Sequence, residues 1–249
     1  MTFDREKSYN NWFDSKFYHI LYENRDNKEA KKFIKNIIYY FDLDKNALIL
    51  DAACGKGRHS IQLEKFGYNV LGIDLAKNSI AEAKKNENLN LKFKVHDMSV
   101  PLQKKFDLLL NLFTSFGYNS KENDIKTLKA FHKNLKNSGF GVLDFLNIEK
   151  IKKELVFSET IKKKNILFDI KRSINKKNQL VKEISFFYEN MKFDFVEHVN
   201  ALNLIDFKKY FDQTHLIIIK IFGDYDLNEF DPIKSPRLII FFKKKSQSN

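Results

Sequence analysis

Apolar and polar residues follow two different periodicities along this chain. Residues 29–41 place their apolar side chains at three- and four-residue steps, which predicts an amphipathic helix. Short apolar runs then predict strands at 47–51, 69–74, 91–96, 106–112 and 141–146. Helical patterns lie near 58–66, 78–86 and 124–136, with Asn78 expected as the N-cap of the second. Strands that alternate with helices are typical of a parallel sheet with helices on both faces.

The periodicity changes in the last third of the chain. Apolar and polar residues alternate over 166–174, 180–188 and 191–199, which predicts an antiparallel meander. A short helix near 204–212 and strands near 215–222 and 237–243 close the chain. We therefore expect the meander to be an insertion between the fifth parallel strand and the last two strands of the same sheet.

Composition narrows the class of protein. A hydrophobic content of 43% over 249 residues is enough for one buried core. The longest apolar runs are too short to span a membrane, and the N-terminus has no signal-peptide core. A single cysteine, Cys54, excludes an intrachain disulfide and favours the cytoplasm.

The net charge of +12 admits two interpretations. It could indicate a nucleic-acid or acidic partner, or it could reflect a coding bias that scatters lysines over every solvated face. The second interpretation is favoured because the charge is mostly lysine and is spread along the chain, whereas phosphate-reading surfaces more often cluster arginine.

The stretch 48–59 carries the most chemical information. An apolar run ends in Asp51, a small-residue turn contains Gly55 and Gly57, and a helical pattern resumes near His59. Glycine lets a ligand approach the backbone, and the N–H groups and dipole of the following helix favour a negative group. Asp51 favours a positive or hydroxyl-bearing group. An amino-acid zwitterion joined to a nucleoside, as in S-adenosylmethionine, satisfies both.

Three further strand ends carry polar residues where an open sheet binds its ligand. Asp74 follows the glycine turn by about 20 residues, the spacing at which an acid accepts ribose hydroxyls. Asp97 can accept from an adenine amino group while Met98 packs on the ring. The segment 111–118 could line the reacting end. A dinucleotide site is disfavoured because Ser60 stands where the third glycine of its motif belongs.

From about residue 12 to residue 243, the chain resembles the class I S-adenosylmethionine-dependent methyltransferases, and more narrowly a bacterial, largely uncharacterised subgroup. The resemblance rests on 51–57, Asp74, Asp97 with Met98, and the strand entry 235–239. It implies a Rossmann-like, doubly wound, mostly parallel seven-stranded α/β sheet with an antiparallel β-meander insertion and an N-terminal helical lid. We expect one domain over 1–249, made of a lid (1–45), a cofactor-binding half (46–150), the insertion (160–200) and a return to the sheet (201–249).

The resemblance also implies the cofactor, S-adenosyl-L-methionine, with S-adenosyl-L-homocysteine as product. Asp74 would bind the ribose, Asp97 and Met98 the adenine, and the backbone of Ala53, Gly55 and Asn111 the methionine portion. The full set expected at the cofactor is Asp51, Ala53, Gly55, Gly57, Arg58, Asp74, Leu75, Asp97, Met98, Asn111, Tyr18, Tyr22 and Arg25. The family usually has glycine where this chain has Ala53, and alanine restricts positive φ.

The lid residues Tyr18, Tyr22 and Arg25 fall on one face of a predicted helix, so Arg25 could pair with the cofactor carboxylate. Packing of the tyrosines on the core is the alternative. Tyr118 and His59 are the candidate catalytic residues, although His59 could instead be structural. No His, Cys or Asp cluster has metal-ligand spacing, so no metal is expected.

The predicted reaction is an in-line methyl transfer to a nitrogen or oxygen of a small-molecule acceptor. The alternatives are a nucleic-acid methyltransferase and a non-catalytic cofactor-binding protein. The fourth strand end reads Asn111-Leu112-Phe113-Thr114, whereas enzymes that methylate base amino groups usually resemble Asn/Asp-Pro-Pro-Tyr/Phe there. We expect a cytoplasmic monomer or homodimer with no membrane association.

Overall fold

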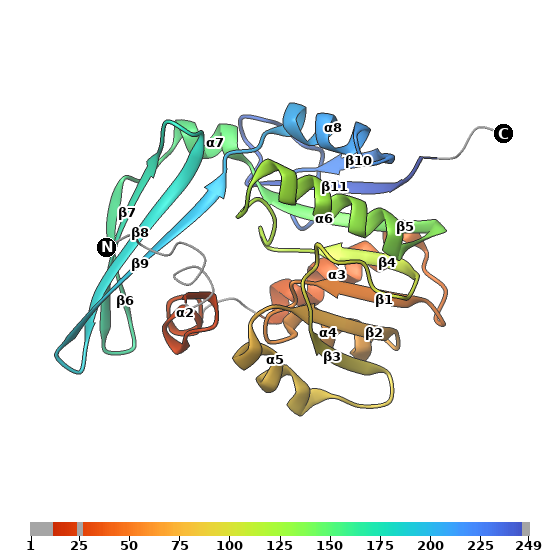
Figure 1. The fold of residues 1–249 in the computed structure, drawn as a ribbon, viewed down its shortest axis with the longest axis horizontal. Coiled ribbons are helices and arrows are strands. Elements are labelled where there is room, and N and C mark those ends of the chain that lie inside the picture. The colour runs from red at the N-terminus through yellow and green to blue at the C-terminus, as the bar shows by residue number, and fades with distance from the viewer. Residues whose placement is uncertain (1–11, 24–26, 246–249) are drawn as a thin grey trace.

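A seven-stranded sheet forms the centre of the molecule (Figure 1). The structure is a computed structural model that describes residues 12–23 and 27–245. The strand order is β10-β11-β5-β4-β1-β2-β3, and β1 to β5 run parallel while β11 is antiparallel to both β5 and β10. The strands are β1 (Leu48–Ala52), β2 (Asn69–Asp74), β3 (Leu91–Val95), β4 (Phe106–Asn111), β5 (Leu135–Leu146), β10 (Leu216–Phe222) and β11 (Arg237–Lys244). The predicted fold class is confirmed.

Helices cover both faces of this sheet. In β4, Leu108 packs with α3 and α4, and the next residue, Leu109, packs on the opposite face with α6 and α8. Because successive side chains of a strand point to opposite faces, strands covered on both sides read as continuous apolar runs. The helices are α3 (Asn27–Phe41), α4 (Arg58–Lys65), α5 (Lys77–Ala83) continued by the 3-10 turn η1 (Lys84–Asn86), α6 (Lys121–Asn134), α7 (Ile148–Lys153) and α8 (Leu204–Asp212).

A second, antiparallel sheet of four strands stands beside the first (Figure 1). Its strands follow the chain order β6 (Ser158–Lys163), β7 (Ile166–Ile174), β8 (Gln179–Tyr188) and β9 (Met191–Asn200). The period-2 pattern predicted the last three strands and missed β6. That strand lies at the edge of the sheet and Ile161 is its only large apolar residue, so it has no alternating apolar face to detect.

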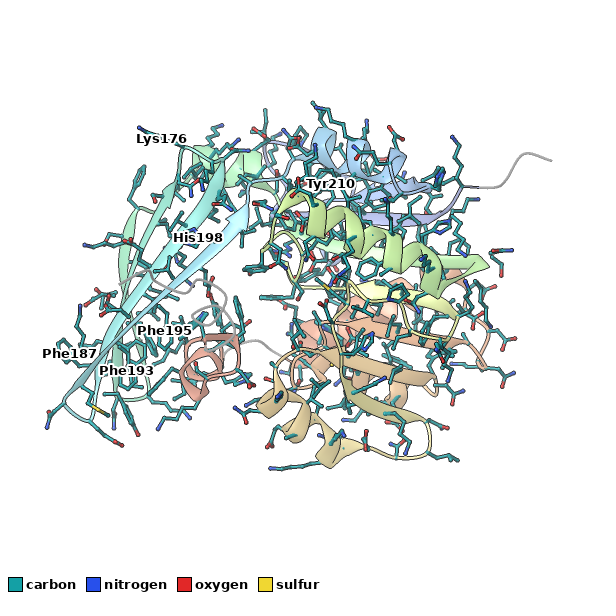
Figure 2. The ribbon with its side chains drawn as sticks, viewed as in Figure 1. Lys176, Phe187, Phe193, Phe195, His198 and Tyr210 are labelled. Carbon is teal, nitrogen blue, oxygen red and sulfur yellow. The ribbon has the colours of Figure 1, made fainter. Side chains whose placement is uncertain are left out.

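The short helix α2 (Lys16–Leu21) packs against one face of the four-stranded sheet. Phe17 lies 4.9 Å from Phe193, and Trp12 lies 4.7 Å from Phe195, measured between ring centroids. Figure 2 shows the two β9 side chains on the side of the sheet that faces α2. These rings belong to a hydrophobic cluster distinct from the two that flank the large sheet.

The expected N-cap of α5 is wrong. The helix begins at Lys77, so Asn78 is its second residue, and Ala76 stands at the N-cap without a side-chain hydrogen bond. Asp14, from the N-terminal segment, accepts the exposed N–H groups instead, as described below. In the described part of the chain, no helix combines the length and apolar character that crossing a membrane requires.

Candidate active site

The loop between β1 and α4 has an unusual backbone. Ala53, Gly55 and Gly57 all have positive φ, of 63°, 55° and 81°. A Cβ at Gly57 would lie 2.5 Å from the ring of Phe93, so only glycine fits there. Gly57 therefore serves close packing between the loop and the sheet, and it does not line the cavity described below.

Asp74, the last residue of β2, holds this loop in place. Its Oδ2 accepts the N–H of Gly55 at 2.7 Å, and its Oδ1 accepts the N–H of Ala76 at 2.8 Å. Burial raises the pKa of this carboxyl above its ordinary value, although hydrogen bonds from the backbone of Ala76, Gly55 and Leu75 act in the opposite direction. An ionised carboxylate has about four acceptor positions, so Asp74 can still accept from a ligand.

Asp51 lies beneath the loop and does not reach the cavity. Its side chain is 1% exposed, and its Oδ2 accepts the hydroxyl of Ser60 at 2.6 Å. Burial raises the pKa of Asp51 to about 6, against the hydrogen bond from Ser60. The carboxyl thus joins β1 to α4.

A cavity of about 810 Å³ opens at the carboxyl edge of β1 to β4. Most of the residues predicted from the sequence line it. They are Tyr18, Tyr22, Ala53, Gly55, Arg58, His59, Asp74, Leu75, Asp97, Met98 and Tyr118. Asp51, Gly57 and Asn111 do not line it, and Arg25 lies outside the described residues.

Asn111, at the end of β4, is fully buried behind the cavity wall. Its Nδ2 donates to the carbonyl of Ala52 at 3.0 Å and lies 3.4 Å from Sδ of Met98. Its Oδ1 has no hydrogen-bond partner among the described residues. Asn111 therefore positions Met98 and the end of β1.

The N-terminal segment, residues 12–23, lines this cavity and is bound to the start of α5. The carboxylate of Asp14 accepts the N–H of Asn78 at 2.9 Å and the N–H of Ser79 at 3.1 Å. The Nε2 of His19 lies 3.3 Å from the hydroxyl of Ser79. Figure 1 shows α2 between the four-stranded sheet and α5. The segment thus joins the small sheet to the edge of the large one.

A second cavity of about 170 Å³ adjoins the first on the side of the four-stranded sheet. The side chains shared by both cavities are Phe13, Tyr18, Tyr22, Phe113, Thr114 and Tyr118. The rings of Tyr18 and Tyr118 each contact the ring of Phe13, with centroids 5.1 and 5.2 Å apart. Five of these six shared residues are aromatic, and together they form the boundary between the two cavities, termed the aromatic passage.

A buried ion pair borders the small cavity, and the sequence assigned it no role. The Nε of Arg237 donates to Oδ1 of Asp144 at 2.7 Å, and its Nη2 donates to Oγ1 of Thr114 at 2.8 Å. The Oδ2 of Asp144 accepts the N–H of Phe113 and the hydroxyl of Tyr225. An acid inside the apolar strand β5 was the available signal, because a buried carboxylate requires a partner.

Glu197 of β9 connects the small sheet to the N-terminal segment. Its Oε1 accepts the indole N–H of Trp12 at 2.5 Å and the hydroxyl of Tyr22 at 3.5 Å. Lys182, opposite Glu197 in the β8–β9 register, donates to the same tyrosine oxygen. This network could not be predicted from the sequence because its members lie far apart along the chain.

Two further features bear on the chemistry. The guanidinium groups of Arg58 and Arg237 lie 5.5 and 5.7 Å from the ring centre of Phe113. Asp124 also lines the large cavity, and burial raises the pKa of its carboxyl to about 7, against a hydrogen bond from Asn200. Within residues 12–23 and 27–245, no group of His, Cys, Asp and Glu could hold a metal ion.

Residues 49–139 match a family described as "Methyltransferase domain". The chain is 29% identical to a probable S-adenosyl-L-methionine-dependent methyltransferase, TehB, of Haemophilus influenzae, over 38% of this chain and 34% of that protein. It is 31% identical to a glycine/sarcosine N-methyltransferase of Aphanothece halophytica, over 48% of this chain and 46% of that protein. The match thus spans less than half the length of these curated relatives.

Solved structures share the fold over nearly the whole chain. An S-adenosylmethionine-dependent methyltransferase from Clostridium acetobutylicum superposes with a TM-score of 0.80 and 22% identity, covering 93% of this chain and 98% of that one. CalS10, an amino pentose methyltransferase from Micromonospora echinaspora solved with bound S-adenosylmethionine, superposes with a TM-score of 0.67 and 14% identity, covering 92% and 97%.

Proposed function

Because the chain belongs to the class I S-adenosylmethionine-dependent methyltransferases, we propose that it transfers a methyl group from S-adenosylmethionine to a nitrogen or oxygen of a small molecule. The observation that carries the proposal is the pair of adjoining cavities, a large one at the carboxyl edge of the parallel strands and a small one behind an aromatic passage. The relatives named for glycine, sarcosine and an amino pentose also act on small molecules.

The large cavity is the proposed cofactor site. Asp74 accepts the ribose hydroxyls, while Asp97 and Met98 hold the adenine, with Leu75 beside them on the wall. The backbone around Ala53 and the side chain of Arg58 border the methionine portion. These assignments are supported by the position of the residues around one cavity and by the remaining acceptor capacity of the Asp74 carboxylate.

Asp51, Gly57 and Asn111 take a different part in this proposal. Each lies behind the wall of the cavity and holds an element that lines it. They shape the site without touching its contents. The N-terminal segment, with Tyr18 and Tyr22, covers the opening and excludes water.

Bound S-adenosylmethionine supplies a methyl carbon made electrophilic by the sulfonium. The protein's contribution is to hold the acceptor in line with that carbon, since alignment at about 3 Å supplies much of the rate enhancement. An amine acceptor needs only to be neutral, whereas a hydroxyl needs a base within hydrogen-bond reach. Tyr118, which lines both cavities, is the proposed acceptor-proximal hydroxyl, and His59 lines the cofactor side.

A small molecule fits the second cavity better than a nucleic acid does. The cavity measures about 170 Å³ and is covered by the N-terminal segment and the four-stranded sheet. We further propose a cytoplasmic location, which the single, buried Cys54 supports. If the substrate were a nucleic acid, the affinity of the protein for nucleic acid would fall steeply as the salt concentration rises. At physiological salt that affinity would be similar to the affinity for the cofactor.

Isothermal titration with S-adenosylhomocysteine tests the cofactor assignment. We expect 1:1 binding, weakened by about 1–3 kcal/mol in Asp74→Ala because the ribose hydroxyls lose their acceptor. The exposed Asp212 provides the control variant, Asp212→Ala, with unchanged affinity. No heat from the wild-type protein would refute the proposal, and unchanged affinity of Asp74→Ala would remove that residue from the site.

A further inference from the structure

The charged side chains that line the small cavity are unequal in sign. Among the residues that the structure describes, three are cations, Arg172, Lys182 and Arg237, and one is an acid, Glu197. The carboxylates that pair with the two arginines belong to Glu159 and Asp144, and neither lines the cavity. The described lining therefore carries an excess of cations, and an excess of one sign of charge favours an occupant of the opposite sign.

Arg237 retains hydrogen-bond donors on the cavity side. A guanidinium has five N–H donors. Asp144 takes the Nε donor and Thr114 takes one from Nη2, while Nη1 donates to no residue that the structure describes. The side chain of Arg237 is 18% exposed and that of its partner Asp144 is 1% exposed. The remaining donors match the two oxygens of one carboxylate, the geometry in which arginine binds most strongly.

The backbone beside Arg237 is strained. Phe113 and Thr114 are not glycines, yet their φ angles are 62° and 56°. Such backbone conformations are unfavourable for residues other than glycine, and they cluster at functional sites. This turn brings the N–H of Phe113 to Asp144 and the hydroxyl of Thr114 to Arg237, so both of its contacts fix the orientation of the guanidinium.

We propose that Arg237 binds a carboxylate of the methyl acceptor, so that the acceptor is a small carboxylic acid held in the second cavity. The inference rests on the proposed function, because the methyl acceptor is the molecule assigned to that cavity. A volume of about 170 Å³ suits a compound on the order of ten non-hydrogen atoms. The acid group lies at Arg237, and the nucleophile faces the aromatic passage lined by Phe13, Tyr18 and Tyr118.

The test compares acids with their neutral analogues. Small amino and hydroxy carboxylic acids, each paired with its carboxamide, are titrated into protein saturated with S-adenosylhomocysteine, and binding is followed by ligand-observed NMR. We expect at least one acid to bind and its amide to bind at least about tenfold more weakly, since the amide loses a charge-assisted pair. Equal binding of acid and amide, or no binding by any acid, would overturn the proposal.

The variant Arg237→Lys keeps the charge that Asp144 requires and removes the planar set of donors. We expect it to weaken acid binding at least about tenfold while S-adenosylhomocysteine affinity stays within about twofold. Lys220→Met removes one exposed charge on β10 and should change neither. If Arg237→Lys binds the acid with the affinity of the wild-type protein, the assignment is also overturned. Should this variant fail to fold, the acid–amide comparison in the wild type decides.

The cofactor titration keeps the two proposals apart. If the protein binds S-adenosylhomocysteine but binds each acid and its amide equally well, the proposed function stands and the carboxylate assignment of Arg237 is wrong. Protein that binds no S-adenosylhomocysteine would lose the proposed function, and acid binding at Arg237 can then be measured without it.

Discussion

Ala53 occupies a backbone conformation that glycine adopts more easily. A left-handed φ of 63° costs an L-residue roughly 1–2 kcal/mol, while glycine adds about 0.4–1 kcal/mol of flexibility to the unfolded chain. We therefore expect Ala53→Gly to raise the free energy of unfolding by about 0.5–1 kcal/mol in urea denaturation. The control Ala130→Gly, in the middle of α6, should lower it by about 1 kcal/mol or more. If Ala53→Gly lowered the free energy of unfolding as much as Ala130→Gly does, the backbone at Ala53 would not be strained.

Asp124 should make stability depend on pH. Its pKa is about 7 in the folded protein and 3.8 in the unfolded chain, so the folded state binds the proton more tightly. Stability from this group is therefore lost as pH rises from about 4 to 7. Relative to the wild type, Asp124→Asn should gain up to about 4 kcal/mol across that window, at about 1.4 kcal/mol per pKa unit.

Chemical denaturation at a series of pH values measures this difference. Asp212→Asn, which changes an exposed aspartate, corrects for the general effect of losing one carboxyl. A constant difference between Asp124→Asn and the wild type from pH 4 to pH 8 would show that burial does not perturb Asp124.

The sequence predicts that a residue lines the cavity most directly where the residue lies at the end of a predicted parallel strand. Asp74 and Asp97 lie just at the ends of parallel strands, and such ends meet at one edge of a sheet. Asp51 lies inside β1, and the direction of its side chain, toward Ser60 of α4, is set by packing between elements. The pairing of Asp144 with Arg237 joins two strands that are distant in the sequence, which no local spacing rule predicts.

Among the elements, α5 depends on a residue far from it in the chain. Asp14 accepts the N–H groups of Asn78 and Ser79, as an N-cap side chain does. We expect Asp14→Ala to lower the free energy of unfolding by about 0.5–2 kcal/mol and to speed hydrogen exchange at both amides. Asp14→Asn keeps an acceptor oxygen and should change both quantities less. Unaltered exchange at Asn78 and Ser79 in Asp14→Ala would disprove the capping role.

Most element boundaries follow from apolar periodicity because the large sheet is covered on both faces. The strand β2 was predicted at its observed limits, 69–74, and α8 at 204–212. Apolar periodicity did not predict the features that do not depend on packing of an apolar face against a neighbouring element. The edge strand β6 has one exposed side and little apolar content, and the cap of α5 comes from another segment.

The whole molecule contains a hydrophobic cluster apart from the two that flank the large sheet. It joins α2 to the four-stranded sheet and contains Trp12, the only tryptophan in the chain. We expect Trp12 fluorescence to report unfolding at a lower urea concentration than far-UV circular dichroism does, since separate clusters open separately. Coincident transitions in the absence of ligand would show that the two sheets unfold as one unit.

S-adenosylhomocysteine should bring these two transitions together. The proposed cofactor cavity is lined by the edge of the large sheet and by the N-terminal segment, so only a chain with both parts folded binds fully. At a ligand concentration of 100 times Kd the stabilisation is about 2.7 kcal/mol. A ligand that raises the circular-dichroism midpoint but leaves the Trp12 midpoint unchanged would indicate that the N-terminal segment takes no part in binding.

Beyond the residues that both cavities share, the two sheets contribute unequally to their walls. Residues at the ends of β1 to β3 border the large cavity, whereas β7 to β9 contribute Arg172, Lys182, Glu197 and Val199 to the small one. Under the proposed function, substitutions on the appended strands can therefore diversify the range of compounds methylated while recognition of the methyl donor is preserved. This modularity makes β7 to β9 the natural place to redirect the enzyme toward new compounds.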